Sequence, residues 1–121
     1  MNDYLATFEQ YKDVKEIADL IDEVKKLRLY YSTRQYDAMY KHIRSLTAKY
    51  LVETLAWNTS HQTMPTTAQQ SYINAETFLR LKGISVLLQK GIKLQEQLSA
   101  DEAAFIESTI KRGGKCNEYC L

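Results

Sequence analysis

Proline and glycine are scarce in this chain, whose 121 residues include one proline and four glycines. A β-rich domain of this length needs many tight turns, and tight turns are built mainly from these two residue types. The scarcity therefore favours a few long helices. Residues 58–65 form the one obvious loop, because the stretch is polar and Pro65 at its end cannot continue a helix.

Long apolar runs are also absent, since no stretch approaches the roughly 20 apolar residues that a membrane-spanning helix needs. The first residues, Met-Asn-Asp-Tyr-Leu, lack the basic segment and apolar core of a secretory leader. We therefore expect a cytoplasmic protein without a membrane partner. In a reducing compartment, Cys116 and Cys120 are expected to be free thiols.

The motifs that usually identify an active site are missing as well. No serine or cysteine stands in a nucleophile motif, and Gly113-Gly114-Lys115 lacks the spacing of a phosphate-binding loop. The two cysteines, even with His42 or His61, supply only one of the two ligand pairs typical of a structural zinc site. We expect no enzyme activity, no cofactor and no metal.

What the chain does contain is apolar periodicity of the helical kind, with repeats every three or four residues. The pattern predicts helices over residues 3–31, 33–57, about 67–98 and about 100–112. With 45% apolar residues and 26% charged residues, the chain can bury a core. The predicted fold class is all-α, a three- or four-helix bundle with antiparallel helices. We expect residues 1–112 to form a single domain and residues 113–121 a flexible tail.

Several helix ends are predicted from local chemistry. Ser32 to Gln35 resembles a capping box that starts the second helix, and the alternative is one helix that continues through this segment. Ser99 to Glu102 is a clearer capping box, and Gly113-Gly114 is expected to end the helix that it starts. Gly83 and Gly91 fall inside the third helix, where each marks a close helix crossing, our preferred interpretation, or a bend.

Charge is unevenly distributed, although the formal net charge is only +1. Residues 1–24 carry seven acidic and two basic side chains, whereas residues 25–49 carry seven basic and one acidic side chain. Cations that alternate with tyrosines are typical of nucleic-acid binding, because cations neutralise phosphates and tyrosine rings stack on bases. The candidate binding residues are Lys25, Lys26, Arg28, Tyr30, Tyr31, Arg34, Lys41, Arg44 and Lys49.

A second interpretation of the same region is that the tyrosines lie at the edge of the core and the cations form a solvated face. Arg34, Lys41 and Arg44, at seven- and three-residue spacing in the predicted helix 33–57, are expected on one side of it. A continuous positive stripe would favour nucleic-acid binding, and scattered cations would favour the solvated face.

Two functions are compatible with these observations. The preferred one is a small non-enzymatic interaction protein, acting as an adaptor, an inhibitor or a structural subunit of a larger assembly. Its partner is then another protein or a second copy of itself in a homo-oligomer. Unburied aromatic residues would anchor such a partner, and the candidates are Tyr4, Phe8, Tyr11, Trp57 and Tyr72. The alternative is a nucleic-acid-binding accessory subunit that uses residues 25–50.

Overall fold

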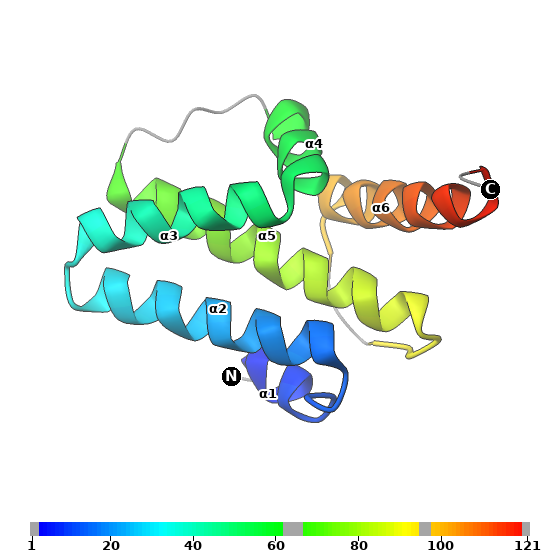
Figure 1. Ribbon diagram of the computed structural model, residues 1–121, viewed down its shortest axis with the longest axis horizontal. Coiled ribbons are helices and arrows are strands. Elements are labelled where there is room, and N and C mark those ends of the chain that lie inside the picture. Colours follow the sequence, from blue (N-terminus) through cyan, green and yellow to red (C-terminus); the bar gives the residue numbers. More distant parts are fainter. Residues whose placement is uncertain (1–2, 62–66, 95–97, 120–121) are drawn as a thin grey trace. The chain divides into compact units, whose positions relative to one another are not determined.

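The computed structural model describes residues 3–61, 67–94 and 98–119, and at 58–61 and 111–119 it describes the backbone alone. Within these ranges every regular element is an α-helix, so the predicted all-α bundle is confirmed. The helices shown in Figure 1 are α1 (Tyr4–Glu9), α2 (Lys15–Ser32), α3 (Tyr36–Lys49), α4 (Leu51–His61), α5 (Ala68–Gln89) and α6 (Ala100–Tyr119). Two of the predicted helices are therefore each divided into two.

The chain divides into two compact units, Met1–Arg80 and Leu81–Leu121. The first unit holds α1 to α4 and the part of α5 up to Arg80, and the second holds the rest of α5 and α6. That residues 1–112 form one domain with a flexible tail stays a prediction. The backbone of α6 continues through Gly113-Gly114, so these glycines do not end the helix as predicted. The predictions about Cys116 and Cys120 fall outside the described side chains.

The first unit is organised around the apolar stripe of α2. Its members recur at three- and four-residue spacing and are buried as the sequence predicts. They are Ile17, Leu20, Ile21, Val24 and Leu27. Helix α3 packs antiparallel to α2, because Tyr30 contacts His42 near the connecting turn while Glu23, further away from it, contacts Lys49.

The first predicted helix is interrupted after Glu9, and the reason lies in its apolar pattern. In a continuous helix, Phe8 would lie about 180° around the axis from Ile17, nine residues later, and would face solvent. A turn over residues 10–14 instead folds α1 back against α2, and Phe8 becomes completely buried. Asp3 begins α1 by accepting a hydrogen bond of 3.2 Å from the backbone N–H of Leu5.

The break between α2 and α3 is confirmed, but the predicted capping box does not form. The backbone N–H of Gln35 donates to the carbonyl of Tyr30 at 2.8 Å, and that of Arg34 donates to the carbonyl of Tyr31 at 3.1 Å. This is a Schellman motif, and it places Arg34 in the left-handed region with φ of 60°. The hydroxyl of Ser32, the expected cap, instead donates back to the carbonyl of Leu29 at 3.1 Å, and the hydroxyl of Thr33 donates to the same carbonyl.

The second predicted helix bends at Tyr50, whose φ of −116° and ψ of 48° are not helical. The chain then continues as α4. The hydroxyl of Thr54 donates to the carbonyl of Tyr50 at 3.0 Å and to that of Leu51 at 3.2 Å. The same hydroxyl lies 3.4 Å from the carbonyl of Thr47 on α3, and this contact links the first turn of α4 to α3.

Gly91 does not lie inside a helix as predicted but ends α5. It has φ of 82°, and the backbone N–H of Ile92 donates to the carbonyl of Leu87 at 3.0 Å. The N–H of Gly91 itself donates to Leu88 at 3.0 Å, which completes a second Schellman motif. No atom of the described residues lies within 4 Å of the position that a Cβ would take at Gly91, so the positive φ explains the glycine.

The capping box at the start of α6 is confirmed. The backbone N–H of Ser99 donates to Oε1 of Glu102 at 3.0 Å, and the N–H of Glu102 donates to Oγ of Ser99 at 3.1 Å. In the same unit, Gly83, predicted to mark a crossing or a bend, is a buried residue inside α5.

Candidate functional site

Lys25 and Lys49, two of the predicted binding cations, are paired with acids of the same chain. Lys25 lies 3.2 Å from a carboxylate oxygen of Glu9, and Lys49 lies 3.0 Å from Oε1 of Glu23. The hydroxyl of Tyr50 donates to the other oxygen of Glu23 at 3.1 Å. Burial raises the pKa of Tyr50 and the negative charge of Glu23 adds to the rise, so the hydroxyl stays protonated and remains a donor.

Arg28 is the most completely engaged of the predicted cations. Its Nε and Nη2 donate to the two oxygens of Glu76 at 3.0 and 2.9 Å, and Nη1 and Nη2 donate to those of Asp3 at 2.6 and 3.1 Å. The guanidinium also lies over the ring of Tyr4, 5.4 Å from its centroid. We call Asp3, Tyr4, Arg28, Tyr72 and Glu76 the Arg28 cluster.

The electrostatics of the Arg28 cluster follow from these contacts. Burial alone would raise the pKa of Glu76, but hydrogen bonds from Arg28 and Tyr72 outweigh it and hold that pKa below its ordinary value. The bond from Arg28 likewise lowers the pKa of Asp3, and burial raises the pKa of Tyr72 to about 12. The hydroxyl of Tyr4 is buried here without a hydrogen bond to any described residue. The cluster joins the start of α1 to α2 and α5.

The two predicted tyrosines contact other rings of the fold. Tyr31 stacks on Tyr72 with ring centroids 4.3 Å apart and an angle of 8° between the planes. Tyr30 meets His42 edge to face at 6.0 Å, and Nε2 of His42 lies 3.0 Å from the backbone carbonyl of Glu23. Both tyrosines are half-buried. A base stacking on Tyr31 would therefore have only one side of the ring to use.

The remaining predicted cations are Lys26, Arg34, Lys41 and Arg44. All are exposed, and none has a side-chain ion pair within the part of the chain that the structure describes. Lys26 lies on α2, while Lys41 and Arg44 lie on α3. The expected grouping of Arg34 with these two on one helix is wrong, because Arg34 lies in the turn before α3.

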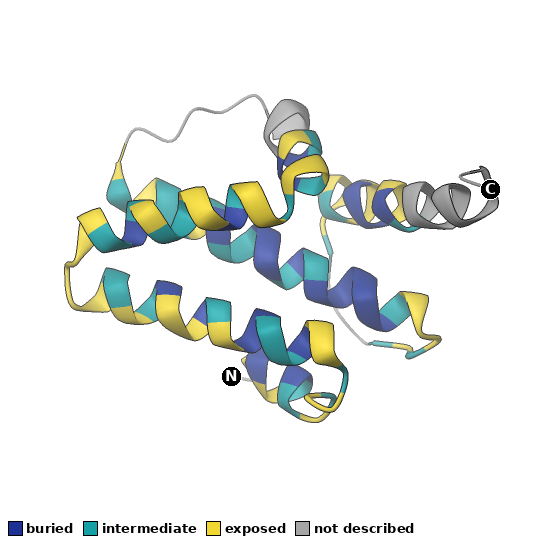
Figure 2. Cartoon of the chain, in the orientation of Figure 1, coloured by how far each residue is buried: buried dark blue, intermediate teal, exposed yellow. Residues whose placement is uncertain are grey.

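Helix α4 has two contrasting sides. Leu51, Val52 and Leu55 are 52%, 59% and 54% exposed, and they share an arc of about 100° on the helix. We call them the α4 apolar face. Thr54 and Trp57, on the other side, are buried, and Figure 2 shows this alternation along α4. Two aromatic residues that the sequence suggested as anchors, Phe8 and Trp57, are thus buried, and aliphatic residues are exposed instead.

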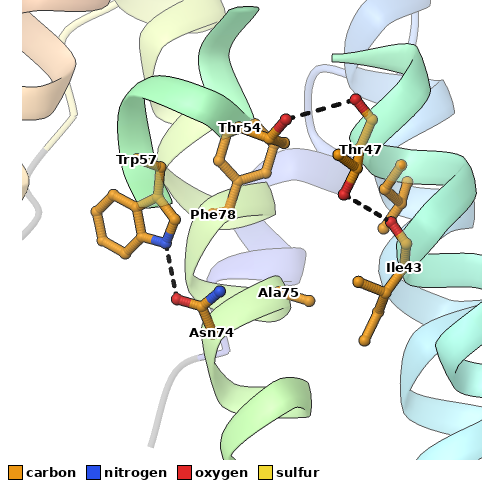
Figure 3. A pocket seen from close by; sticks show the side chains of 8 residues that line it. Ile43, Thr47, Thr54, Trp57, Asn74, Ala75 and Phe78 are labelled. Atoms are coloured by element: carbon orange, nitrogen blue, oxygen red, sulfur yellow. Dashed lines mark hydrogen bonds between the residues drawn. The ribbon is translucent and has the colours of Figure 1, made fainter. Parts of the chain in front are cut away.

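A pocket of about 60 Å³ lies among α3, α4 and α5, on the buried side of α4 (Figure 3). Figure 3 shows Trp57 and Asn74 at one end of it and Ile43 and Thr47 at the other. We call this the Trp57 pocket; the described residues that line it are Ile43, Leu46, Thr47, Thr54, Trp57, Asn74, Ala75 and Phe78. Sequence reasoning missed it, because its walls come from three helices.

Some of the polar groups that line the Trp57 pocket make hydrogen bonds with each other or with the backbone. The indole Nε1 of Trp57 donates to Oδ1 of Asn74 at 2.9 Å. Because an indole N–H can only donate, this bond fixes which end of the carboxamide is oxygen. The hydroxyl of Thr47 donates to the carbonyl of Ile43 at 3.1 Å. The amide nitrogen of Asn74 makes no hydrogen bond with the residues that the structure describes.

The described residues contain neither a candidate metal site nor a membrane-spanning helix. Among the described side chains, no group of three His, Cys, Asp or Glu residues is placed to hold a metal ion. None of the described helices is both long enough and apolar enough to cross a lipid bilayer.

The comparisons with known proteins give no further guide. No protein-family model, no curated protein and no solved structure matches this chain.

Proposed function

We propose that this chain is a non-enzymatic protein-interaction module that serves as an adaptor, an inhibitor or a structural subunit of a larger assembly. The observation that carries this proposal is the α4 apolar face. Three adjacent aliphatic side chains, each more than half exposed, lie on one side of one helix. Scattered exposed leucines are ordinary, but neighbouring ones on a helix are typical of a face that another helix or a second copy covers.

The energetics agree with an interface of moderate size. Full burial of a leucine or valine side chain stabilises a complex by roughly 1.5–3 kcal/mol. Covering the exposed halves of Leu51, Val52 and Leu55 would therefore contribute about 3 kcal/mol before any polar contact is counted. The partner is another protein or a second copy of the chain, and the cytoplasm expected from the sequence remains part of this proposal.

The alternative, a nucleic-acid-binding accessory subunit, has less support. Lys25, Arg28 and Lys49 are already neutralised by acids of the chain, which removes counterion release as a source of affinity at those positions. The remaining four candidate cations lie on α2, in the turn and on α3.

The test compares Leu55→Gln with the matched control Leu29→Gln. Leu29 is 55% exposed on α2, outside the α4 apolar face, so both substitutions remove one exposed leucine and keep a good helix former. Sedimentation velocity over a range of concentrations tests self-association, and quantitative affinity capture from the source cells tests other partners. We expect Leu55→Gln, and not Leu29→Gln, to weaken association. A chain that stays monomeric and captures the same proteins in wild-type and both variant forms contradicts the proposal.

A further inference from the structure

We propose that the Trp57 pocket is a binding site for one leucine-like side chain of a partner, held together with the backbone carbonyl next to it. The proposal rests on the protein-interaction function above and names the chemistry that the partner presents. Three observations carry it: the volume of the pocket, the absence of charge in its described walls, and an amide donor at its edge that has no partner among the described residues.

The volume selects the size of the occupant. One water molecule needs about 10–15 Å³ of such space, so a pocket of about 60 Å³ accepts roughly four to six atoms of that size. A branched aliphatic side chain such as that of leucine has this bulk. A methyl group would leave most of the pocket empty, and an indole would exceed it.

The walls select an uncharged occupant. None of the eight described lining residues is ionisable, and five of them, Ile43, Leu46, Trp57, Ala75 and Phe78, have apolar side chains or large apolar rings. A carboxylate or an ammonium group placed here would lose its hydration without gaining an opposite charge. The pocket is thus unsuited to a phosphate, an amino acid zwitterion or a metal ion.

The NH₂ group of Asn74, which has no partner among the described residues, favours a hydrogen-bond acceptor beside the aliphatic group. The bond from Trp57 holds the oxygen of the Asn74 carboxamide toward the indole. The NH₂ group is therefore turned to the other side, and Figure 3 shows it on the side of Ala75 and Ile43. A peptide carbonyl beside an aliphatic side chain would accept a hydrogen bond from this NH₂ group at the edge of an apolar pocket.

Tryptophan fluorescence reports on this pocket alone, because Trp57 is the only tryptophan of the chain. Titration with N-acetyl-L-leucinamide, monitored by tryptophan emission, should give a saturable change with a Kd of about 1–10 mM, as expected for a ligand of this size. N-acetyl-L-alaninamide, which lacks the branched group, should bind at least about tenfold more weakly. No saturable change with the leucine compound, or the same affinity for both, overturns the assignment.

Two variants locate the binding. Ala75→Leu fills the pocket and should abolish the response, while Asn74→Asp keeps the acceptor for Trp57, loses the NH₂ donor and should weaken binding about tenfold. Should either variant fail to fold by circular dichroism, the wild-type chain still decides. The NMR signals of the Asn74 NH₂ and the Trp57 indole N–H must then shift with the leucine compound, and unshifted signals overturn the proposal.

The titration needs no partner protein and does not involve Leu55. Its failure therefore overturns the pocket assignment alone, whereas failure of the Leu55→Gln comparison overturns the proposed function.

Discussion

Asn74 and Glu76 stand two residues apart on α5, yet they belong to clusters of opposite character. Glu76 lies in the Arg28 cluster, where charges meet in direct bonds and the guanidinium makes four hydrogen bonds to two carboxylates. Asn74 lies in the Trp57 pocket, whose described walls carry no charge and whose amide donor has no partner among the described residues. The difference separates a cluster that holds the fold together from one that has room for a ligand.

The largest change in stability is expected for Arg28→Met, which removes the central residue of the Arg28 cluster. Glu76 and Asp3 would keep their negative charges and lose their partner, and leaving a half-buried charge unpaired is costly. We expect the free energy of unfolding in urea to fall by about 2 kcal/mol, a value reduced for the partial exposure of the cluster. Lys25→Met, which breaks only the exposed pair with Glu9, is the control and should cost less than about 0.5 kcal/mol. Equal effects of the two substitutions would remove the distinction that we draw.

A gain in the free energy of unfolding is expected when the Trp57 pocket is filled. Ala75→Leu places apolar atoms in a space of about 60 Å³, and at about 24 cal/mol per Å³ of cavity the gain is at most about 1.4 kcal/mol. We therefore expect this variant to unfold at a higher urea concentration than the wild type, although it no longer binds the leucine compound. A clear loss of stability would mean that the pocket has no room for those atoms.

A smaller effect should appear as a pH dependence confined to the charged cluster. Because Arg28 and Tyr72 hold the pKa of Glu76 below its ordinary value, the stability that this carboxylate contributes is complete above the unfolded pKa and is lost as the pH falls through the folded pKa. The stability difference between the wild type and Glu76→Gln should therefore shrink between about pH 6 and pH 2. Asn74→Leu, in the neutral pocket, should differ from the wild type by an amount that does not change over this range. A constant difference for Glu76→Gln would contradict the assigned pKa direction.

The smallest effect is expected where neither cluster is touched. Replacing Lys41 and Arg44 by glutamine should change the free energy of unfolding by less than about 0.5 kcal/mol, because both side chains are exposed. Fluorescence anisotropy with a labelled oligonucleotide at two salt concentrations then tests the alternative function. Binding that weakens with salt, and a salt dependence that is reduced in the double variant, would favour nucleic acid over protein as the partner.

Helices whose limits depend on neighbouring residues were mostly predicted from the sequence, whereas those that depend on distant residues were not. The stripe from Ile17 to Leu27 and the box from Ser99 to Glu102 depend on neighbours within a turn or two, so the sequence reveals them. Phe8 shows the limit, because only its burial against α2 explains why the first helix breaks. Gly91 was placed inside a helix because the apolar pattern runs past it, while its positive φ ends α5.

The candidate site was harder to predict from sequence. The pairing of Arg28 with Glu76 spans 48 positions, and that of Trp57 with Asn74 spans 17 and crosses a loop. Neither spacing has a periodic signature. The region from Lys25 to Lys49 is strongly basic in sequence, with one acid, but sequence alone does not show which cations have acidic partners elsewhere in the chain.

The left-handed backbone of Arg34 has a consequence for how the first unit opens. A side chain costs about 1 kcal/mol in this conformation, which glycine adopts without that cost. The strain is released whenever the turn between α2 and α3 unravels, so local opening there is favoured roughly fivefold over a turn with glycine. In hydrogen exchange, the amide of Gln35, which bonds to the carbonyl of Tyr30, should therefore become better protected in Arg34→Gly than in the wild type, and unchanged protection would show that the turn stores no such strain.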